Sequence, residues 1–222
     1  MRVERKRKQL NPVNVIDISE IAAGVYYLKL KRPFDFIAGQ VIALAMQPDA
    51  EPRLYSIASG INEDYIGILF DLNPDGELTP QLVNLKEGET VFMSDPFGKF
   101  HCAPEPAVWI ATGTGIAPFI SMVRSGRTEN VQLIHGARYL KSFFFSALFK
   151  TELSSSYLRF CTAEAGDGVI DGRLTDYLRN KNDLSTDIKY YLCGGSQMVI
   201  DVREILLSKG IPFDHIIAEI YF

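Results

Sequence analysis

The pattern of apolar residues changes at a proline-bearing segment near the middle of the chain, APEP at residues 103–106. Before this segment, short runs alternate between apolar and polar residues and are separated by turn sequences such as NPDG at residues 73–76. A period of two is typical of β-strands. After it, apolar runs are followed by glycine-rich turns and by stretches with helical periodicity. The sequence therefore predicts two domains of different architecture, residues 1–102 and residues 103–222.

The first half is expected to form a small antiparallel barrel or sandwich. Its alternating runs predict strands at residues 25–30, 40–46, 53–58, 66–71 and 90–93. Short strands that follow one another at this spacing, with turn residues between them, are typical of these two folds.

The second half is expected to form a parallel sheet with helices packed against it. Apolar runs predict strands at residues 108–111, 131–135, 158–162 and 190–193. The stretches between and after them predict helices at residues 117–123, 142–153, which includes Phe143 to Phe145, and 197–209, the last closed by Gly210. This alternation indicates the doubly wound fold of a nucleotide-binding domain.

Composition excludes several classes of function. A net charge of −4 does not favour a nucleic-acid-binding protein, and the basic residues at positions 2–8 are expected to be a solvated tail. Cys102, Cys161 and Cys193 are too few and too scattered for a disulfide framework or a metal centre, and the three histidines lack ligand spacing. We therefore expect a cytoplasmic protein without a metal site, without a membrane-spanning segment and without a signal peptide.

A glycine-rich turn follows the first strand of the second half, in the sequence ATGTGIAPF at residues 111–119. Glycines at 113 and 115 let backbone N–H groups approach a pyrophosphate, and the start of a helix adds partial positive charge. Pro118 stands where a third glycine is usual, and a helix accepts proline only in its first turn. An ordinary tight turn remains the alternative interpretation.

Two arginines favour a phosphorylated nucleotide. A site for NAD would place a carboxylate after the second strand, whereas this chain has Arg138 there and no acid. Arg138, together with Arg173 near the start of a later helix, therefore favours the 2′-phosphate of NADP, although each could equally be an exposed surface residue. At the end of another strand, Cys193-Gly194-Gly195 would allow a ligand to approach the backbone, or Cys193 could be a buried structural cysteine.

The sequence RLYSIAS at residues 53–59 combines an arginine and a tyrosine on one face of a strand of the first half. Alternation places Arg53, Tyr55 and Ile57 on one face and Leu54, Ser56 and Ala58 on the other. The strand is either an ordinary barrel strand with a polar rim or the wall of a site for a flat, anionic molecule.

Taken together, these motifs resemble the ferredoxin–NADP reductase superfamily, over nearly the whole chain from FIAGQ at residues 36–40 to the end. The chain is most similar to the bacterial ferredoxin/flavodoxin–NADP reductases, because their motifs occur here in order: RLYSIAS, PDGELTPQL, ATGTGIAPF, HGARY, GRL and the ending EIYF. The resemblance implies an N-terminal antiparallel β-barrel that binds FAD, followed by a Rossmann-like α/β domain that binds NADP, with NAD possible.

The resemblance also assigns roles to residues. It implies that Arg53 binds the FAD pyrophosphate, that Tyr55 and Tyr221 cover the two faces of the isoalloxazine, and that Ser56 lies near flavin N5. The other FAD contacts that it implies are Leu54, Leu69, Glu77, Leu78, Thr79, Thr114 and Phe222. On the NADP side it implies Gly115, Arg138, Arg173, Cys193 and Gly194, and it places Ser56, Cys193, Glu219 and Tyr221 at the locus of hydride transfer.

The implied activity is electron transfer between NADPH and a separate carrier protein, ferredoxin or flavodoxin, by hydride transfer to flavin N5. Two alternatives remain: an NAD(P)H-dependent flavin reductase component that supplies an oxygenase or another acceptor, and a non-catalytic nucleotide-binding subunit. One departure bears on the nucleotide. The bacterial reductases often carry an arginine after the strand at 158–162, where this chain has Thr162-Ala163-Glu164, so NAD stays possible.

Overall fold

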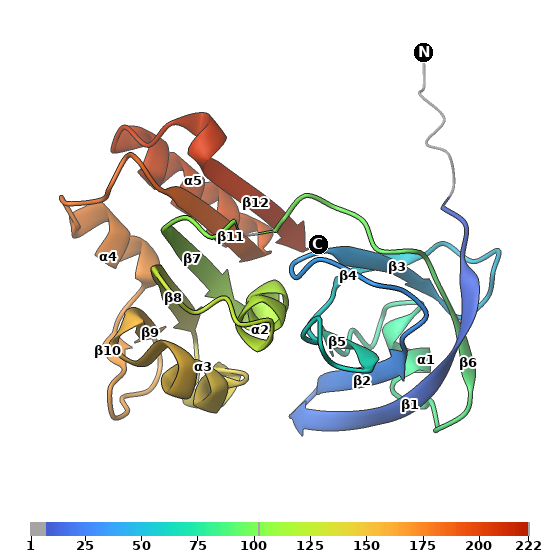
Figure 1. Ribbon diagram of the computed structural model, residues 1–222. Helices are drawn as coiled ribbons and strands as arrows, with labels where there is room; N and C mark the ends of the chain where they lie inside the picture. The colour runs from blue at the N-terminus through green and yellow to red at the C-terminus, as the bar shows by residue number, and fades with distance from the viewer. Residues whose placement is uncertain (1–7, 102, 222) are drawn as a thin grey trace, which may run out of the picture.

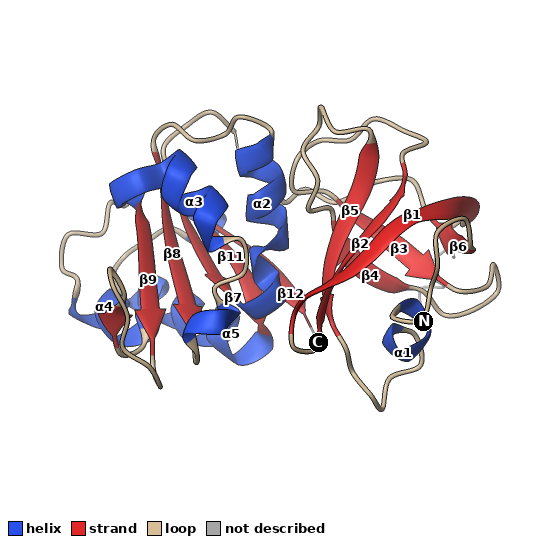
Figure 2. Cartoon of the chain, turned by 90° about the horizontal axis from the view of Figure 1, so that it is seen from below, coloured by secondary structure: helices blue, strands red, loops and turns tan. Residues whose placement is uncertain are grey.

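A computed structural model describes residues 8–101 and 103–221, without the side chains of Ile220 and Tyr221. Its strands form two sheets of six strands each, which lie beside one another (Figure 1, Figure 2). The first sheet is antiparallel and comprises β1 (Asn11–Ala22), β2 (Val25–Lys31), β3 (Val41–Ala45), β4 (Arg53–Ser56), β5 (Tyr65–Asp71) and β6 (Thr90–Met93). A single turn of helix, α1 (Thr79–Leu82), precedes β6.

The antiparallel sheet curls into the shape of a barrel without closing fully. Its strand order is β4-β3-β6-β1-β2-β5, and the two edge strands approach each other through an isolated bridge between Ile57 and Ile68. The backbone N–H of Ala58 adds a hydrogen bond to the carbonyl of Gly67 at 2.7 Å. Alternation along β4 continues past its end, since Ile57 enters the barrel core whereas Ala58 enters the core shared with the second half. The prediction of a barrel-like first half is confirmed.

The longest strand, β1, was missed by the sequence analysis. It has twelve residues, of which only Val13 and Val15 are buried. Its pairing with β2 also shifts register twice, between Val15 and Asp17 and between Glu20 and Ala22. A strand that buries few side chains and changes register does not show the regular alternation by which strands are recognised in a sequence.

The second sheet is parallel, with the order β10-β9-β8-β7-β11-β12. Its strands are β7 (Ala107–Thr112), β8 (Val131–Ala137), β9 (Tyr157–Cys161), β10 (Ile170–Asp171), β11 (Lys189–Gly195) and β12 (Ile216–Tyr221). Its helices are α2 (Ala117–Arg124), α3 (Ser146–Leu153), α4 (Leu174–Asn180) and α5 (Ser196–Ser208). Short 3₁₀ turns occur at Gly113–Ile116, Leu140–Ser142, Ser154–Ser156 and Phe213–His215.

The helices cover both faces of this sheet, as a doubly wound fold requires. Buried residues of α2 and α3 pack with one apolar cluster, and those of α4 and α5 pack with another on the opposite face. The strand order reverses at β7, which has β8 on one side and β11 on the other. Ligands of such sheets bind beyond the carboxyl ends of the strands at this reversal. The predicted fold class of the second half is confirmed, and none of the helices within the described residues is long and apolar enough to cross a membrane.

The helix expected at residues 142–153 begins later than predicted, at Ser146. The preceding aromatic residues lie in irregular backbone, and Phe145 has a left-handed conformation with φ of 55°. Phe143 packs edge-on against His135 of β8, with ring centroids 5.1 Å apart, whereas Phe145 packs 5.5 Å from Tyr27 of the barrel. The left-handed backbone of Phe145 excludes a regular helix through residues 143–145, and the two rings reach partners in different sheets.

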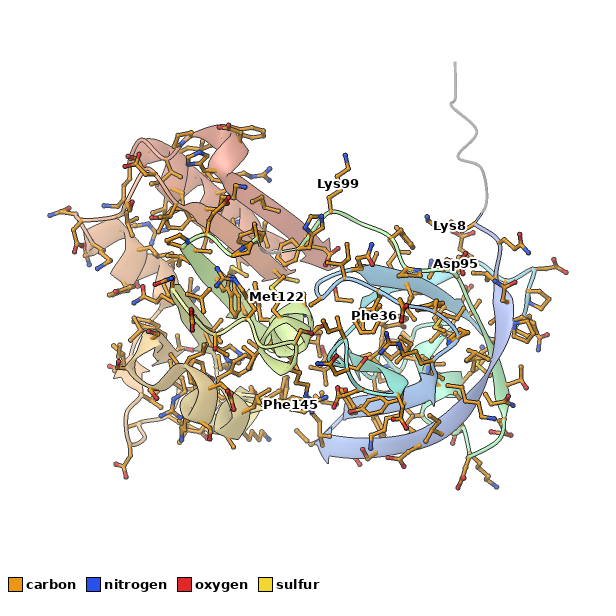
Figure 3. The ribbon with its side chains drawn as sticks, viewed as in Figure 1. Lys8, Phe36, Asp95, Lys99, Met122 and Phe145 are labelled. Atoms are coloured by element: carbon orange, nitrogen blue, oxygen red, sulfur yellow. The ribbon has the colours of Figure 1, made fainter. Side chains whose placement is uncertain are left out.

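An apolar cluster is continuous across the two halves. It includes Tyr27, Ala58 and Leu69 from the barrel together with Trp109 and Phe119 from the second half. Helix α2 lies between the two sheets (Figure 1, Figure 2). Figure 3 shows Met122 and Phe145 where the two halves meet.

The glycine-rich turn packs directly against the end of β11. A Cβ atom on Gly115 would lie 2.4 Å from Gly194 Cα and 2.5 Å from the backbone of Cys193, closer than real Cβ atoms approach. Gly194 itself has a φ of 149°, and a Cβ there would lie 2.4 Å from Thr112 Oγ1. The two glycines are therefore required by the close approach of two backbone segments, independently of any ligand.

We expect Gly115→Ala to lower the free energy of unfolding by about 1–3 kcal/mol, because the turn must move away from β11 to make room for the methyl group. Gly195→Ala is the control, since nothing lies within 4 Å of a Cβ there and its φ is −58°. The control should lose about 1 kcal/mol or less, the cost of a weaker helix N-cap. Urea unfolding of both variants checks this, and equal stability of Gly115→Ala and the wild type would contradict it.

Candidate active site

The site lies where the carboxyl ends of the parallel strands meet strand β4 of the barrel. The hydroxyl of Ser56, the last residue of β4, donates a hydrogen bond to Glu219 Oε2 of β12 at 2.7 Å. Strand register places Cys193 of β11 directly beside Glu219, and beside Ala111 of β7 on its other side. Three residues predicted to lie at the locus of hydride transfer, Ser56, Cys193 and Glu219, are thus brought together from distant parts of the sequence.

The environment of Glu219 favours its protonated form. Burial raises the pKa of this carboxyl above its ordinary value, and the hydrogen bond from Ser56 offsets the shift only in part. Cys193 is fully buried. A carboxyl group with a raised pKa that is hydrogen-bonded to a hydroxyl is chemically suited to hold a proton.

Strand β4 presents Tyr55 toward the barrel and Leu54 toward solvent. Tyr55 packs edge-on against Phe70 with ring centroids 6.1 Å apart, and burial raises its pKa to about 12, while nearby Arg53 acts in the opposite direction. Arg53 and Tyr55 therefore lie near each other, as the alternation of the strand predicts. Leu54 is 58% exposed, and Ser56 points toward β12. Because successive side chains of β4 have different surroundings, the strand can contact a ligand through both its face and its end.

The loop before α1 brings a second group of predicted residues close to β4. Glu77 Oε2 lies 4.0 Å from Arg53 Nη2, and both side chains are largely exposed. Leu78 is buried in the barrel core. The Thr79 hydroxyl accepts a hydrogen bond from the N–H of Asn73 at 2.9 Å, so this side chain stabilises its own loop. Leu69 of β5 is buried in the cluster shared by the two halves.

Thr114, in the glycine-rich turn, is hydrogen-bonded to the barrel. Its hydroxyl donates to Asp71 Oδ2 at 2.8 Å, and Asp71 is the last residue of β5. Burial raises the pKa of Asp71, and the hydrogen bond from Thr114 opposes the shift. The sequence analysis did not identify Asp71, because a single acid at the end of a strand carries no local signal of a partner 43 residues away.

An open cavity of about 830 Å³ lies at the carboxyl ends of the parallel strands. Arg138 and Arg173, the two arginines predicted to bind a phosphate, both line it. Its walls also include Gly113, Ser142, Thr162 and Gln197, of which Ser142 and Gln197 were not predicted as site residues from the sequence. A smaller neighbouring cavity of about 490 Å³ shares Arg173. The cavity therefore brings two cationic side chains and part of the glycine-rich turn to one place.

Glu164, in the loop after β9, has a structural partner. Its Oε2 accepts a hydrogen bond from the backbone N–H of Leu140 at 2.6 Å. The carboxylate thus fastens the loop after β9 to the turn after β8. Arg159 secures the same loop by donating to the carbonyls of Asp167 and Gly168, at 2.8 Å and 3.1 Å.

The structure describes some of the remaining predicted residues only in part and others not at all. Tyr221 lies at the end of β12, with its backbone paired to Gly195, but its side chain and the whole of Phe222 lie outside the described residues. The same holds for the basic segment at residues 1–7 and for Cys102. Among the residues that the structure describes, no group of three histidine, cysteine or acidic side chains could hold a metal ion. His135 is fully buried, and burial lowers its pKa to about 3.

Comparison with known proteins agrees with this geometry. Residues 109–204 match the family of oxidoreductase NAD-binding domains. The chain is 31% identical to the flavodoxin/ferredoxin–NADP reductase of Escherichia coli strain K12 over 196 residues, which cover 76% of this chain and 77% of the relative. It is also 26% identical to the ferredoxin–NAD(P)(+) reductase component of the naphthalene 1,2-dioxygenase system of Pseudomonas putida, covering 88% of this chain but 63% of that longer protein.

A solved structure shows the same fold over nearly the full length. The ferredoxin NADP+ reductase of Neisseria gonorrhoeae, crystallised with bound FAD and NADP, superposes with a TM-score of 0.86 at 21% identity and covers 97% of this chain and 100% of its own. The fold that the sequence predicts is therefore found in a protein of similar length. On the identity and coverage of the Escherichia coli relative, this chain belongs to the flavodoxin/ferredoxin–NADP reductase family.

Proposed function

We propose that the protein is an FAD-dependent reductase that moves electrons between NADPH and a one-electron carrier protein, ferredoxin or flavodoxin, in the cytoplasm. The observation that carries this proposal is the hydrogen bond from Ser56 to Glu219 beside Cys193. It joins the strand proposed to bind a flavin to the strand ends proposed to bind a nicotinamide. We also propose that residues 1–102 bind the flavin and residues 103–222 bind the nucleotide.

The residues around β4 fit FAD. Arg53 is 54% exposed at its side chain, and its ion pair with Glu77 is long, so its guanidinium is available to a diphosphate. Tyr55 offers an aromatic surface that Phe70 supports from its edge. Past the end of β4 the barrel edge joins β5 through the Ile57–Ile68 bridge and the hydrogen bond from Ala58 to Gly67, so the barrel stays partly open and one rim of the sheet is available to a planar ring. Bound flavin would supply the ability to accept a hydride and to release its electrons one at a time.

The cavity at the strand ends fits NADP. A volume of about 830 Å³ is in the range of sites for cofactors of this size. Arg138 and Arg173 supply the positive charge that a 2′-phosphate requires, and the turn at Gly113–Gly115 lets the backbone approach a pyrophosphate. Glu164 accepts a hydrogen bond from the backbone N–H of Leu140, and this bond fixes its carboxylate.

Residues of the chain would position the reacting rings and handle protons. Ser56 and Glu219 form a hydrogen-bonded pair in which the carboxyl, with its raised pKa, can hold a proton and pass it through the hydroxyl. Buried Cys193 shapes the floor beside this pair. The side chain of Tyr221, at the end of β12, is proposed to cover one face of the flavin.

A second candidate function is that of a reductase component that supplies an oxygenase. The similarity to the naphthalene 1,2-dioxygenase component favours it, because that protein is a ferredoxin–NAD(P)(+) reductase component of an oxygenase system. Steady-state reduction of a panel of ferredoxins and flavodoxins with NADPH and NADH separates the two candidates. Efficient reduction of flavodoxin with NADPH supports the first, and reduction of oxygenase ferredoxins with NADH supports the second.

The proposed activity predicts the colour of the protein and how it responds to nicotinamides. Purified protein should be yellow with the absorbance of FAD, and anaerobic NADPH should bleach it faster than NADH does. Absorbance spectra and stopped-flow traces measure both. A colourless protein that cannot be reconstituted with flavin would exclude the enzyme proposal.

Removal of a cavity arginine should discriminate between the two nicotinamides. We expect Arg173→Gln to raise the KM for NADPH about tenfold or more, because a charge-assisted hydrogen bond to a phosphate is lost. The KM for NADH should change about twofold or less. Arg179→Gln is the control, since Arg179 lies on the same helix in an exposed ion pair with Asp176. An equal rise in the KM for both nucleotides would show that Arg173 does not bind the 2′-phosphate.

Glu219 should make stability depend on pH. Because its pKa is raised in the folded state, the folded protein binds more protons than the unfolded chain above the ordinary carboxyl pKa. Stability of the wild type should therefore fall as pH rises from this value through the raised pKa, relative to Glu219→Gln, which does not titrate. The free energy of unfolding of Glu219→Gln minus that of the wild type should therefore increase over this pH range and then level off.

Urea unfolding at a series of pH values, from about 4 to 8, measures this difference. Ser56→Ala provides a second check, because loss of the hydrogen bond that lowers the pKa of Glu219 should extend the range to higher pH. A difference between wild type and Glu219→Gln that stays constant with pH would show that Glu219 does not titrate in this way.

A further inference from the structure

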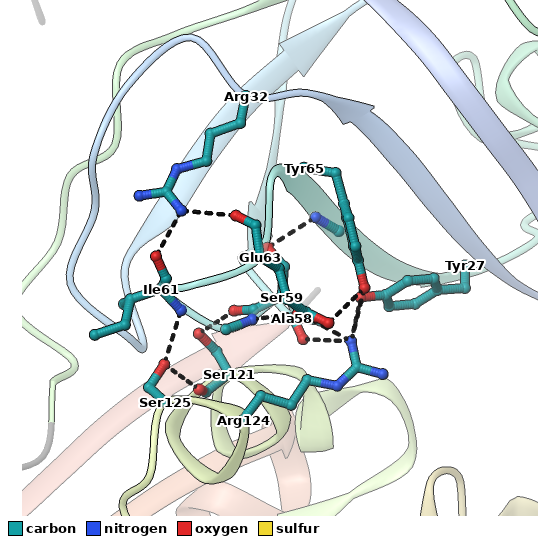
Figure 4. A network of polar contacts seen from close by, with 12 residues as sticks. Tyr27, Arg32, Ala58, Ser59, Ile61, Glu63, Tyr65, Ser121, Arg124 and Ser125 are labelled. Carbon is teal, nitrogen blue, oxygen red and sulfur yellow. Dashed lines mark hydrogen bonds and ion pairs between the residues drawn. The ribbon is translucent and has the colours of Figure 1, made fainter.

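A cluster of polar and aromatic side chains holds the C-terminal end of α2 against the barrel. At its centre is Arg124, the last residue of α2, whose Nη1 atom contacts four oxygen atoms of the barrel half (Figure 4). These are the hydroxyls of Tyr27 and Tyr65, at 2.8 and 3.3 Å, the Glu63 carboxylate at 3.4 Å and the carbonyl of Ala58 at 3.5 Å. We call these five residues the α2 anchor. Its members come from three separate stretches of the barrel sequence and from one helix.

The α2 anchor is itself held firmly. Glu63 accepts hydrogen bonds from the N–H of Gly60 at 2.6 Å and from the Tyr65 hydroxyl at 2.8 Å. The Arg124 guanidinium lies over the rings of Tyr27 and Phe145, at 5.6 Å and 5.2 Å from their centroids. Burial holds the pKa of Tyr27 far above its ordinary value, so its hydroxyl stays neutral. A single cation thus satisfies a partly buried carboxylate and two phenol groups.

Further contacts show that one face of α2 packs against the barrel. The Ser121 hydroxyl donates to the carbonyl of Ser59 at 2.7 Å, and Ser125 Oγ accepts from the N–H of Ile61 at 3.0 Å. Residues 121, 124 and 125 share a face of a helix because they are three and four positions apart. A Cβ on Gly60 would lie 2.8 Å from the Arg124 carbonyl oxygen, so the barrel backbone touches the helix end.

The other end of α2 continues into the glycine-rich turn. The 3₁₀ turn Gly113–Ile116 passes without a break into α2, and Pro118 lies in its first turn. Thr114 of this turn is hydrogen-bonded to Asp71 of the barrel. A short helix is stiff, so a displacement at Arg124 is transmitted to the turn about 12 Å away along the helix axis. Contacts at both ends of this segment therefore link the turn to the barrel.

We propose that Arg124, through the α2 anchor, is a positioning residue that fixes the nicotinamide-binding turn relative to the flavin-binding strand. This inference rests on the proposed function. Donor and acceptor of the hydride would be held by different halves of the protein, so their separation depends on contacts between the halves. A misplacement of 1 Å by a distant substitution can reduce a rate about a hundredfold.

The test compares Arg124→Met with Arg124→Lys and with Arg179→Met, an exposed arginine on α4 as the matched control. Single-turnover reduction of the FAD-loaded protein over a range of NADPH concentrations gives a limiting rate and an apparent Kd. Arg124→Met should lower the limiting rate about tenfold and change the apparent Kd by about twofold or less. Arg124→Lys should recover part of the rate, because the ammonium keeps the charge and three donors but loses the planar group that lies over Tyr27 and Phe145.

An unchanged limiting rate in Arg124→Met, or a loss shared equally by Arg179→Met, would overturn the inference. Gly60→Ala provides a second variant that leaves Arg124 intact. Its added methyl should push the end of α2 outward and lower the limiting rate in the same direction. A rate loss in Arg124→Met without one in Gly60→Ala would show that charge, and not the position of α2, matters.

A third measurement separates failure of this inference from failure of the proposed function. Amide hydrogen exchange of residues 117–125 should be faster in Arg124→Met than in the wild type, while exchange in α4 and α5 stays the same. Unchanged exchange at residues 117–125 would overturn the anchoring itself, whatever the activity of the variant, and faster exchange in α4 and α5 as well would indicate a global loss of stability. A wild-type protein that no nicotinamide reduces would instead refute the proposed function, and the exchange data would still decide the anchoring.

Discussion

The packing of α2 between the two sheets is the constraint on which the arrangement of the site depends. On one side the helix is packed on the parallel sheet, where Phe119 stacks on Trp109 with ring centroids 5.3 Å apart. On the other side it contacts the barrel through Ser121, Arg124 and Ser125. Because the same segment begins with the glycine-rich turn, the packing that joins the halves also places the backbone that is to meet a dinucleotide.

Apolar and polar contacts have different roles at this junction. The shared apolar cluster supplies most of the burial, but dispersion and hydrophobic contacts tolerate small displacements. Hydrogen bonds of defined length, such as Ser56–Glu219 at 2.7 Å and Thr114–Asp71 at 2.8 Å, restrict the two halves to one relative position. Both acids have a raised pKa because they are buried there. The contacts that order the junction therefore include two carboxyl groups that are able to hold protons, those of Glu219 and Asp71.

Much of the fold follows from local sequence, and much of the site does not. Strands β3, β5 and β7 are readable because they bury nearly every residue, whereas β1 buries only two of its side chains and was not predicted. The late start of α3 depends on aromatic partners in two sheets, which no local pattern reveals. Arg138 and Arg173 were predicted from their positions after a strand and before a helix, and both line the cavity. Arg124 was not, because its partners lie 59 to 97 residues away.

The Ser56–Glu219 hydrogen bond joins residues 163 positions apart, and Glu219 belongs to the last strand of the chain. Contacts of such long range are costly in chain entropy, since a large loop must close when they are made. This hydrogen bond connects β4, at one edge of the first sheet, to β12, at one edge of the second. The integrity of the proposed centre for hydride transfer therefore reports on the tertiary structure of both halves together, and not on either sheet alone.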